Sequence, residues 1–114
     1  MAEYLTLKRN GDFRRAYAIG KCLRDPALVI YIVKNRAGCR RLGITAGKKI
    51  GGAVERNRAR RIIKAAFCEL AGELPDNFDF VFVARTRTCK MKSTQINAVM
   101  RRLLAKAGIL KDVK

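Results

Sequence analysis

The strongest constraint on the fold is a segment beginning at Val54 whose apolar residues recur with the period of a helix. They are Ala59, Ile62, Ile63, Ala66, Phe67 and Leu70, and they predict an amphipathic helix of about 17 residues. Gly51 and Gly52 precede this helix, and the sequence ELPDN at 73–77 ends it. An apolar stripe of this length must be buried, so the chain needs a sheet or other helices against which it can pack.

The opposite face of the same helix carries cations and one amide. Placing Arg56 at zero and advancing 100° per residue puts Arg60, Lys64, Asn57 and Arg61 between about 40° and 140°. Arg58 stands apart near about 200° and could reach a different part of a partner. Solvated helix faces usually mix both signs, because like charges four residues apart repel. A surface for a polyanion is therefore favoured over the alternative, a solubilising face.

Composition points to the same class of partner. The 114 residues are expected to form a single domain (1–114), and 26 basic against 9 acidic residues give a net charge of +17. Self-repulsion on this scale favours nucleic acid as the first candidate and an anionic membrane as the second. The guanidinium fork and the Asn57 amide suit RNA better than lipid headgroups, and the helix lacks the large outward apolar side chains of an interfacial helix.

The remaining elements follow from shorter patterns. We expect a helix capped by Asn10 and closed by Gly20, and then a strand at 27–35 that is joined by a turn at 35–38 to a second hairpin strand within 40–47. A strand at 78–85, a basic loop at 86–92, and a helix capped by Ser93 or Thr94 and ended by Gly108 should follow. Leu28, Ile30 and Ile32 should face one side of their strand, and Val29, Tyr31 and Val33 the other. A sheet, a helix and a further strand in one domain imply a parallel crossover and an α/β sandwich.

No catalytic or metal-binding pattern is evident in the residues. Histidine is absent, and the four cysteines have no C-x-x-C spacing, so we expect reduced thiols in a cytosolic protein and no zinc site. Asp76 and Asp79 are interpreted as turn and edge residues. The N-terminus lacks an apolar signal core, and no apolar run approaches a membrane span.

Three segments together resemble one known family. The sequence RLGITAGKKIGGAVERNRARRIIKAAF (41–67) closely resembles the signature of the bacterial ribonuclease P protein subunit. LKRNGDFRRAYAIGK (7–21) looks like the N-terminal helix of that family, and DFVFVAR (79–85) is similar to its last strand. The resemblance covers nearly the whole chain in the correct order, and it departs only at Thr-Ala-Gly (45–47), where the family often has Ser-Val-Ser.

The resemblance implies a fold and a division of labour. The family fold is αβββαβα, an α/β (α+β) sandwich with a central mixed sheet, a first strand near 21–25 and a left-handed βαβ crossover. Ribonuclease P removes the 5′ leader of precursor tRNA, and its RNA subunit is the catalyst and holds Mg²⁺. The protein is then an accessory subunit in the cytoplasm. Its partners are ribonuclease P RNA and precursor tRNA, and it has no catalytic residue, tightly bound cofactor, metal ligand, small-molecule substrate or membrane contact.

The resemblance also assigns residues to two surfaces. Catalytic RNA would meet Lys48, Lys49, Arg56, Asn57, Arg58, Arg60, Arg61 and Lys64. The leader would lie in a cleft formed by Phe13, Arg14, Tyr17, Tyr31 and Arg85, because aromatic side chains rimmed by arginine suit single strands. Periodicity alone favours core packing for Phe13 and Tyr17, and it leaves the face of Tyr31 undecided.

Several questions stay open at the level of sequence. Arg40 and Arg41 are expected to be exposed, but they are assigned to neither of the two surfaces. The order of the basic loop at 86–92 without RNA, the preferred leader bases and the oligomeric state of a holoenzyme cannot be deduced. Another small RNA-binding protein, such as a ribosomal protein, and a stand-alone nuclease are the alternative functions.

Overall fold

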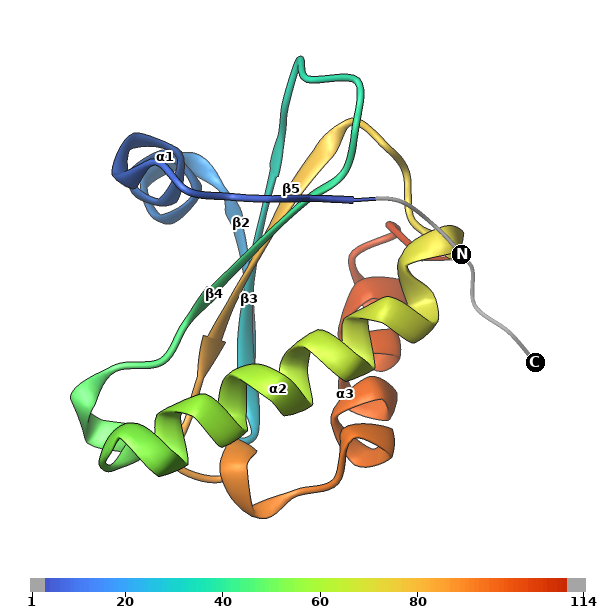
Figure 1. Cartoon of the computed structure of the whole chain (residues 1–114). Coiled ribbons are helices and arrows are strands. Elements are labelled where there is room, and N and C mark those ends of the chain that lie inside the picture. The colour runs from blue at the N-terminus through green and yellow to red at the C-terminus, as the bar shows by residue number, and fades with distance from the viewer. Residues whose placement is uncertain (1–3, 111–114) are drawn as a thin grey trace.

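A five-stranded mixed sheet organises the chain, and the computed structural model describes residues 4–110. In chain order the elements are β1 (Leu5–Thr6), α1 (Asn10–Ile19), β2 (Lys21–Asp25), β3 (Leu28–Lys34), β4 (Arg41–Thr45), η1 (Lys48–Ile50), α2 (Ala53–Leu70), η2 (Ala71–Glu73), β5 (Phe78–Ala84), η3 (Thr88–Lys90) and α3 (Ser93–Lys106). The strands lie side by side in the order β1-β4-β5-β3-β2. Helix α1 covers one face of the sheet, and α2 and α3 cover the other (Figure 1). The expected αβββαβα order is confirmed, with β1 added before it.

β5 occupies the centre of the sheet because its side chains are apolar on both faces. Phe80 and Phe82 are fully buried in the main core, on the side of α2 and α3, and Val81 is buried in a smaller core with residues of α1. β3 pairs with β5 in antiparallel fashion, and β4 pairs with β5 in parallel. A strand buried on both faces needs a neighbour on each edge as well, so β5 lies between β3 and β4.

The predicted hairpin between β3 and β4 is therefore wrong. β3 pairs with β2 and β5, whereas β4 pairs with β1 and β5. The chain does turn at 35–38, where Gly38 has a positive φ of 71°. The connection then passes over the end of β5 to reach the far side of that strand. A glycine-containing turn indicates that the chain reverses, but it does not specify which strand becomes the neighbour.

The alternation predicted for β3 is confirmed. Leu28, Ile30 and Ile32 belong to the main core, and Val33 belongs to the small core with Tyr31 packed against it. The family-derived strand at 21–25 is confirmed as β2. β1 escaped prediction because it has only two residues, both exposed, and a pair of residues has no period to detect.

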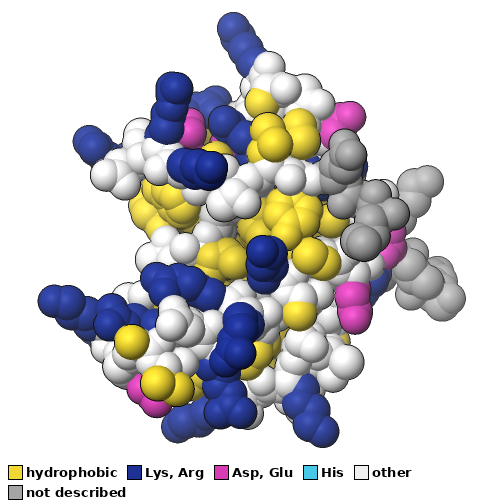
Figure 2. Space-filling model, viewed as in Figure 1, with side chains coloured by type: hydrophobic (Ala, Val, Ile, Leu, Met, Phe, Trp, Pro, Cys, Tyr) yellow, Lys and Arg dark blue, Asp and Glu magenta, His cyan; other side chains and the backbone are white. Residues whose placement is uncertain are grey.

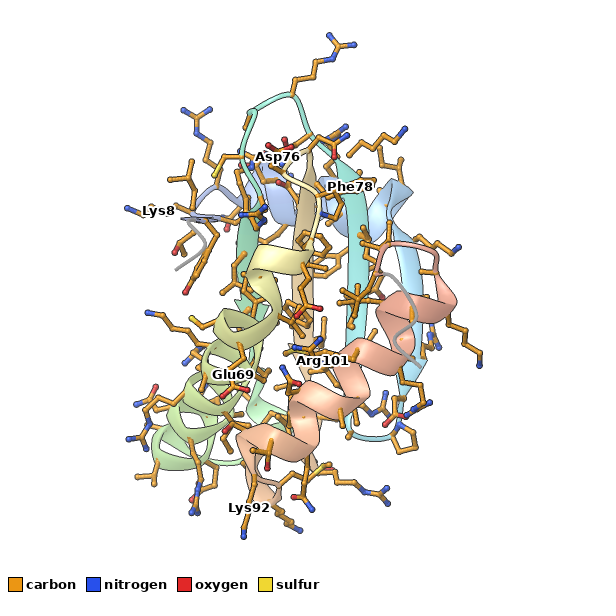
Figure 3. The ribbon with its side chains drawn as sticks, turned by 90° about the vertical axis from the view of Figure 1, so that its right-hand side faces the viewer. Lys8, Glu69, Asp76, Phe78, Lys92 and Arg101 are labelled. Carbon is orange, nitrogen blue, oxygen red and sulfur yellow. The ribbon has the colours of Figure 1, made fainter. Side chains whose placement is uncertain are left out.

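The connection from β4 through α2 to β5 joins adjacent parallel strands. In Figure 3 α2 and α3 lie in front of the sheet, and β4, α2 and β5 form a left-handed crossover. Right-handed connections are the strong general preference, so local pattern could not have predicted this hand. The resemblance to the family did predict it. The crossover directs the start of α2 toward the β4 side of the molecule (Figure 1).

Helix starts differ from their expected caps by one residue. The N-cap of α1 is Arg9 rather than Asn10, and that of α3 is Lys92 rather than Ser93 or Thr94. At α3 the Gln95 side chain accepts a hydrogen bond from the Lys92 backbone N–H at 2.9 Å. A residue in the first turn of the helix therefore provides the partner for the N–H of the N-cap residue. The predicted ends are confirmed, because Gly20 follows α1 directly and Gly108 follows α3 with a φ of 76°.

An ion pair between Arg41 and Asp79 joins β4 to β5. Arg41 donates from Nε to Asp79 Oδ1 at 2.6 Å and from Nη2 to Oδ2 at 2.8 Å, and Asn35 donates to the same carboxylate at 2.7 Å. The Asp79 side chain is 1% exposed, so its interpretation as an edge residue is wrong. Arg41 was expected to be exposed and is half-buried, because it satisfies this carboxylate; its pKa is raised by the hydrogen bond to Asp79. Arg40 is half-buried as well and donates to the Leu74 carbonyl at 2.8 Å.

Two further findings bear on chemistry. The four cysteines are free thiols, which agrees with the expectation of unpaired cysteines. Among the helices at 4–110, none has the length and apolar character needed to cross a bilayer.

Replacing Asp79 by alanine removes the carboxylate that Arg41 and Asn35 share. We expect Asp79→Ala to lower the free energy of unfolding by about 3 kcal/mol, because it leaves a half-buried guanidinium with only the more distant Asp12 carboxylate as a counter-charge. Urea unfolding followed by circular dichroism measures the change. Asp76→Ala removes the same charge from an exposed turn position and should stay within about 0.5 kcal/mol of the parent. Equal losses in the two variants would show that only net charge matters.

Candidate nucleic-acid interface

The cationic face of α2, defined as Arg56, Asn57, Arg60, Arg61 and Lys64, is directed to solvent. Arg56 is half-buried and the other four side chains are exposed. Within residues 4–110 the ion pairs found involve Arg41, Arg101 and Arg102, and none involves this face. The positive charge of α2 therefore lacks an internal counter-charge in the described part of the chain.

Asn57 has a local role on this face. Its Oδ1 accepts a hydrogen bond from Arg60 Nη1 at 3.3 Å, one helical turn further on. An amide can accept this bond without cancelling the guanidinium charge, as a carboxylate would. The asparagine thus holds an arginine in place while the face stays fully cationic.

The segment before α2 fixes where this face begins. Ile50 is buried and anchors the turn that carries Lys48 and Lys49, both of which are exposed. Gly51 has a φ of 141°, and a Cβ at this position would lie 3.0 Å from the Glu55 side chain. Glu55 accepts a hydrogen bond from the Gly52 N–H at 2.8 Å, so the one acid among these arginines is committed to the helix start.

The predicted aromatic residues gather where α1 meets the sheet. The Tyr17 and Tyr31 rings pack edge to face with centroids 5.0 Å apart. Tyr17 is 40% exposed, and its hydroxyl is 2.6 Å from Thr45 Oγ1. Tyr31 is half-buried, and a hydrogen bond with the Cys22 thiol, together with burial, raises its pKa. Core packing, the alternative for Tyr17, does not describe so exposed a ring.

Phe13 takes part in both core and surface. It is half-buried against the small core, and its ring lies over Gly43, where a Cβ would be only 2.8 Å from the nearest ring carbon. The Phe13 ring can occupy this position only because Gly43 has no side chain. The outer side of the same ring lines a groove at the surface.

That surface feature, the aromatic groove, runs over β4 between α1 and α2. One part of about 440 Å³ is lined by Asn10, Phe13, Arg14, Tyr17, Ile44, Thr45, Ala46 and Arg60. An adjoining part of about 290 Å³ is lined by Thr6, Leu7, Phe13, Leu42, Ile44, Arg60, Arg61 and Lys64. The two parts share Phe13, Ile44 and Arg60, so they adjoin each other, and the name covers both. Figure 2 shows hydrophobic side chains between two lobes that both carry Lys and Arg.

The structure joins two surfaces that the resemblance kept apart. Phe13, Arg14 and Tyr17 line the aromatic groove, as the leader assignment requires, and Tyr31 supports the Tyr17 ring. Arg60, Arg61 and Lys64 line the same groove although they were assigned to catalytic RNA alone. Sequence gave no signal of this, because α1 and α2 are distant along the chain. Arg85 is exposed at the end of β5 and lines neither part of the groove.

The carboxylates near these surfaces form ion pairs or hydrogen bonds within the protein. Asp79 and Asp12 both face Arg41, at 2.6 and 3.7 Å, and Glu55 holds the start of α2. Among the described residues there is no group of three or more His, Cys, Asp or Glu side chains placed to hold a metal ion. The interface therefore offers cations, amides and aromatic rings rather than a carboxylate cluster.

Substitutions at Gly43 test the contact that shapes the groove. We expect Gly43→Ala to lower the free energy of unfolding by about 1–3 kcal/mol, because the new methyl group collides with the Phe13 ring. Adding Phe13→Leu should recover part of this loss relative to Phe13→Leu alone, which a double-mutant cycle in urea measures. Gly47→Ala is the control, since a Cβ there has no neighbour within 4 Å. Additive effects of Gly43→Ala and Phe13→Leu would contradict the proposed contact.

Known proteins share both the sequence and the fold. The family model described as Ribonuclease P matches residues 1–108. The ribonuclease P protein component of Clostridium botulinum (strain Loch Maree / Type A3) is 38% identical over 104 residues, covering 90% of this chain and 94% of that protein. The corresponding protein of Pelotomaculum thermopropionicum is 39% identical over 104 residues, covering 90% and 92%.

Solved structures agree with these matches. The RNase P protein of Staphylococcus aureus superposes with a TM-score of 0.82 at 29% identity, covering 96% of this chain and all of that one. The RNase P protein of Thermotoga maritima gives 0.77 at 27% identity, covering 89% and 96%. With its fold, its cationic helix and its full-length sequence matches in agreement, the chain belongs to the ribonuclease P protein family.

Proposed function

We propose that this chain is the protein subunit of ribonuclease P, which binds the catalytic RNA and the 5′ leader of precursor tRNA and assists removal of the leader. The observation that carries the proposal is the aromatic groove. It places exposed and half-exposed rings of α1 beside unneutralised cations of α2. Rings can stack on bases while cations hold the phosphates of the same strand. Family membership supports the assignment to ribonuclease P, and we place the protein in the cytoplasm with that enzyme.

Catalytic RNA is assigned to the start of α2 and the turn before it. Lys48, Lys49 and Arg58 are exposed there together with most of the cationic face. Guanidinium groups form paired hydrogen bonds with phosphate oxygens, and binding releases the counterions of the RNA. Assembly with the RNA would also relieve the repulsion between like charges on one helix face.

The leader is assigned to the aromatic groove. Tyr17 presents an exposed ring, and Arg14 and Arg60 line the same depression. Because Arg60 belongs to α2, a strand in the groove would also lie against the helix that meets catalytic RNA. Stacking is insensitive to base identity, so one groove can accept leaders of many sequences.

Catalysis is assigned to the RNA subunit, with Mg²⁺ held mainly by RNA. The donor set of the groove fits this division. Its acidic neighbours Asp12 and Asp79 are directed to Arg41, while the groove itself is lined by cations and by groups without charge. The protein would then bind and position substrate, so the holoenzyme is the endoribonuclease and this chain is its accessory.

One cleavage assay distinguishes this function from its alternatives. Precursor tRNA is incubated at low Mg²⁺ with catalytic RNA alone, with protein alone and with both. We expect a marked gain in cleavage rate only for the pair, because the protein supplies cations that would otherwise come from the metal ion. Cleavage by the purified protein alone would identify a stand-alone nuclease. The absence of any gain would indicate an RNA-binding protein of another kind.

The role of Tyr17 is tested by comparing precursor with mature tRNA. We expect Tyr17→Ala to weaken holoenzyme binding of precursor roughly tenfold or more, through loss of a stacked base, and to leave mature tRNA binding unchanged. Tyr17→Phe should retain most of the affinity because it keeps the ring. Ile19→Ala is the matched control, since Ile19 is 66% exposed on the same helix but does not line the groove. Equal weakening of precursor and mature tRNA binding would show that Tyr17 does not contact the leader.

A further inference from the structure

The basic loop that follows β5 is held rigidly by the protein itself. Thr88 at its centre is fully buried, and its hydroxyl donates to the Ala27 carbonyl at 2.5 Å. The same oxygen accepts a hydrogen bond from the Arg85 N–H at 2.9 Å, and Cys89 is buried beside it. These bonds anchor η3 to the residue before β3, and η3 also packs against α2. The loop thus has a defined conformation that rests on contacts within the protein.

The rigid loop directs two lysines into solvent next to α2. Lys90 and Lys92 are both exposed, and Lys92 points away from the N-terminal ends of α2 and α3 (Figure 3). A hollow of about 280 Å³ lies between the start of α3 and α2, and it is lined by Arg58, Arg61, Ile62, Ala65 and Ser93. We call Arg58, Lys90 and Lys92 the far-side surface. In the described part of the chain none of the three forms an ion pair.

Arg58 and Arg60 point to different sides of α2. Arg60 lines the aromatic groove and Arg58 lines the hollow beside α3, while Arg61 lies between them and lines both. Residues two apart on a helix point about 160° away from each other, and a helix with its side chains is about 10 Å thick. A strand stacked on Tyr17 would therefore lie against the Arg60 side of α2, and a partner of Arg58 would lie against the other side.

The chemistry of the far-side surface suits phosphates rather than bases. No aromatic residue occurs from Arg85 to Ser93, so this surface has no ring on which an unpaired base could stack. Arg87 acts on the Asp25 carboxylate. Burial opposes ionisation of this group, but the Ala27 N–H, the paired Arg102 and the charge of Arg87 together lower its pKa. Arg87 is left out of the surface for that reason. Fixed cations without rings match the backbone of folded RNA.

We propose that the far-side surface is a separate contact for the phosphate backbone of folded catalytic RNA, made on the side of α2 opposite the leader. This inference rests on the proposed function. It adds two lysines of the η3 loop to the assembly surface and assigns Arg58 to a segment of RNA other than the one that meets Arg60. Catalytic RNA would then contact α2 at the far-side surface, and the aromatic groove would remain accessible to the leader.

The test is the salt dependence of binding to catalytic RNA by the full-length protein. Lys90→Ala combined with Lys92→Ala removes two charges and leaves Thr88 and its anchoring bonds in place. The matched control is Arg36→Ala combined with Lys106→Ala, which removes two exposed charges away from the η3 loop. Equal thermal melting curves for the two variants check that both are folded. Dissociation constants are measured at constant Mg²⁺ over a series of monovalent salt concentrations.

We expect the logarithmic salt slope to fall by about 1–2 in the lysine variant and to stay unchanged in the control, since each lost phosphate contact removes about 0.9 from the slope. Equal slopes in the two variants, with steep binding retained, would overturn the far-side contact and leave the proposed function standing. Failure of the parent protein to bind catalytic RNA would overturn the proposed function and this inference with it. A loss confined to leader-containing precursor would also overturn the inference, because the partner would then be the leader.

Discussion

Burial of β5 on both faces is the constraint on which the rest of the structure depends. Phe80 and Phe82 require α2 and α3 on one side, and Val81 requires α1 on the other. Because β3 and β4 must flank this strand, the chain between them crosses the end of the sheet, and α2 must return from β4 to β5. This arrangement brings α1 and the start of α2 to the same strand, β4, where the groove lies between them.

Several acids among the described residues form contacts that stabilise the fold, and they do not neutralise the cationic face of α2. Asp79 joins two strands through Arg41, Glu55 holds the start of α2, and Glu73 pairs with Arg101, which keeps the pKa of that exposed carboxyl below its ordinary value. None of these carboxylates belongs to the cationic face of α2. The result is a folded scaffold with a face of one sign, a distribution that suits a partner whose own charge is carried by phosphates.

Much of the fold could be predicted from sequence because its signals are local. The apolar period gave α2 to within a residue of its bounds, and alternation gave the two faces of β3. What could not be predicted depends on distant contacts. The partner of β4, the burial of Asp79 and the place of Arg60 in the groove all arise from segments far apart along the chain. The resemblance supplied the hand of the crossover, which no local pattern contains.

The bond between the Tyr17 hydroxyl and Thr45 has a consequence for the speed of recognition. Together with the edge of Tyr31, it holds the exposed ring in one orientation before any ligand arrives. The conformational entropy of that side chain is therefore lost during folding, and binding does not have to restrict the side chain again. A nucleotide bound there, as proposed, would meet a ring already in its final orientation, and its capture would not wait for this side chain to rearrange.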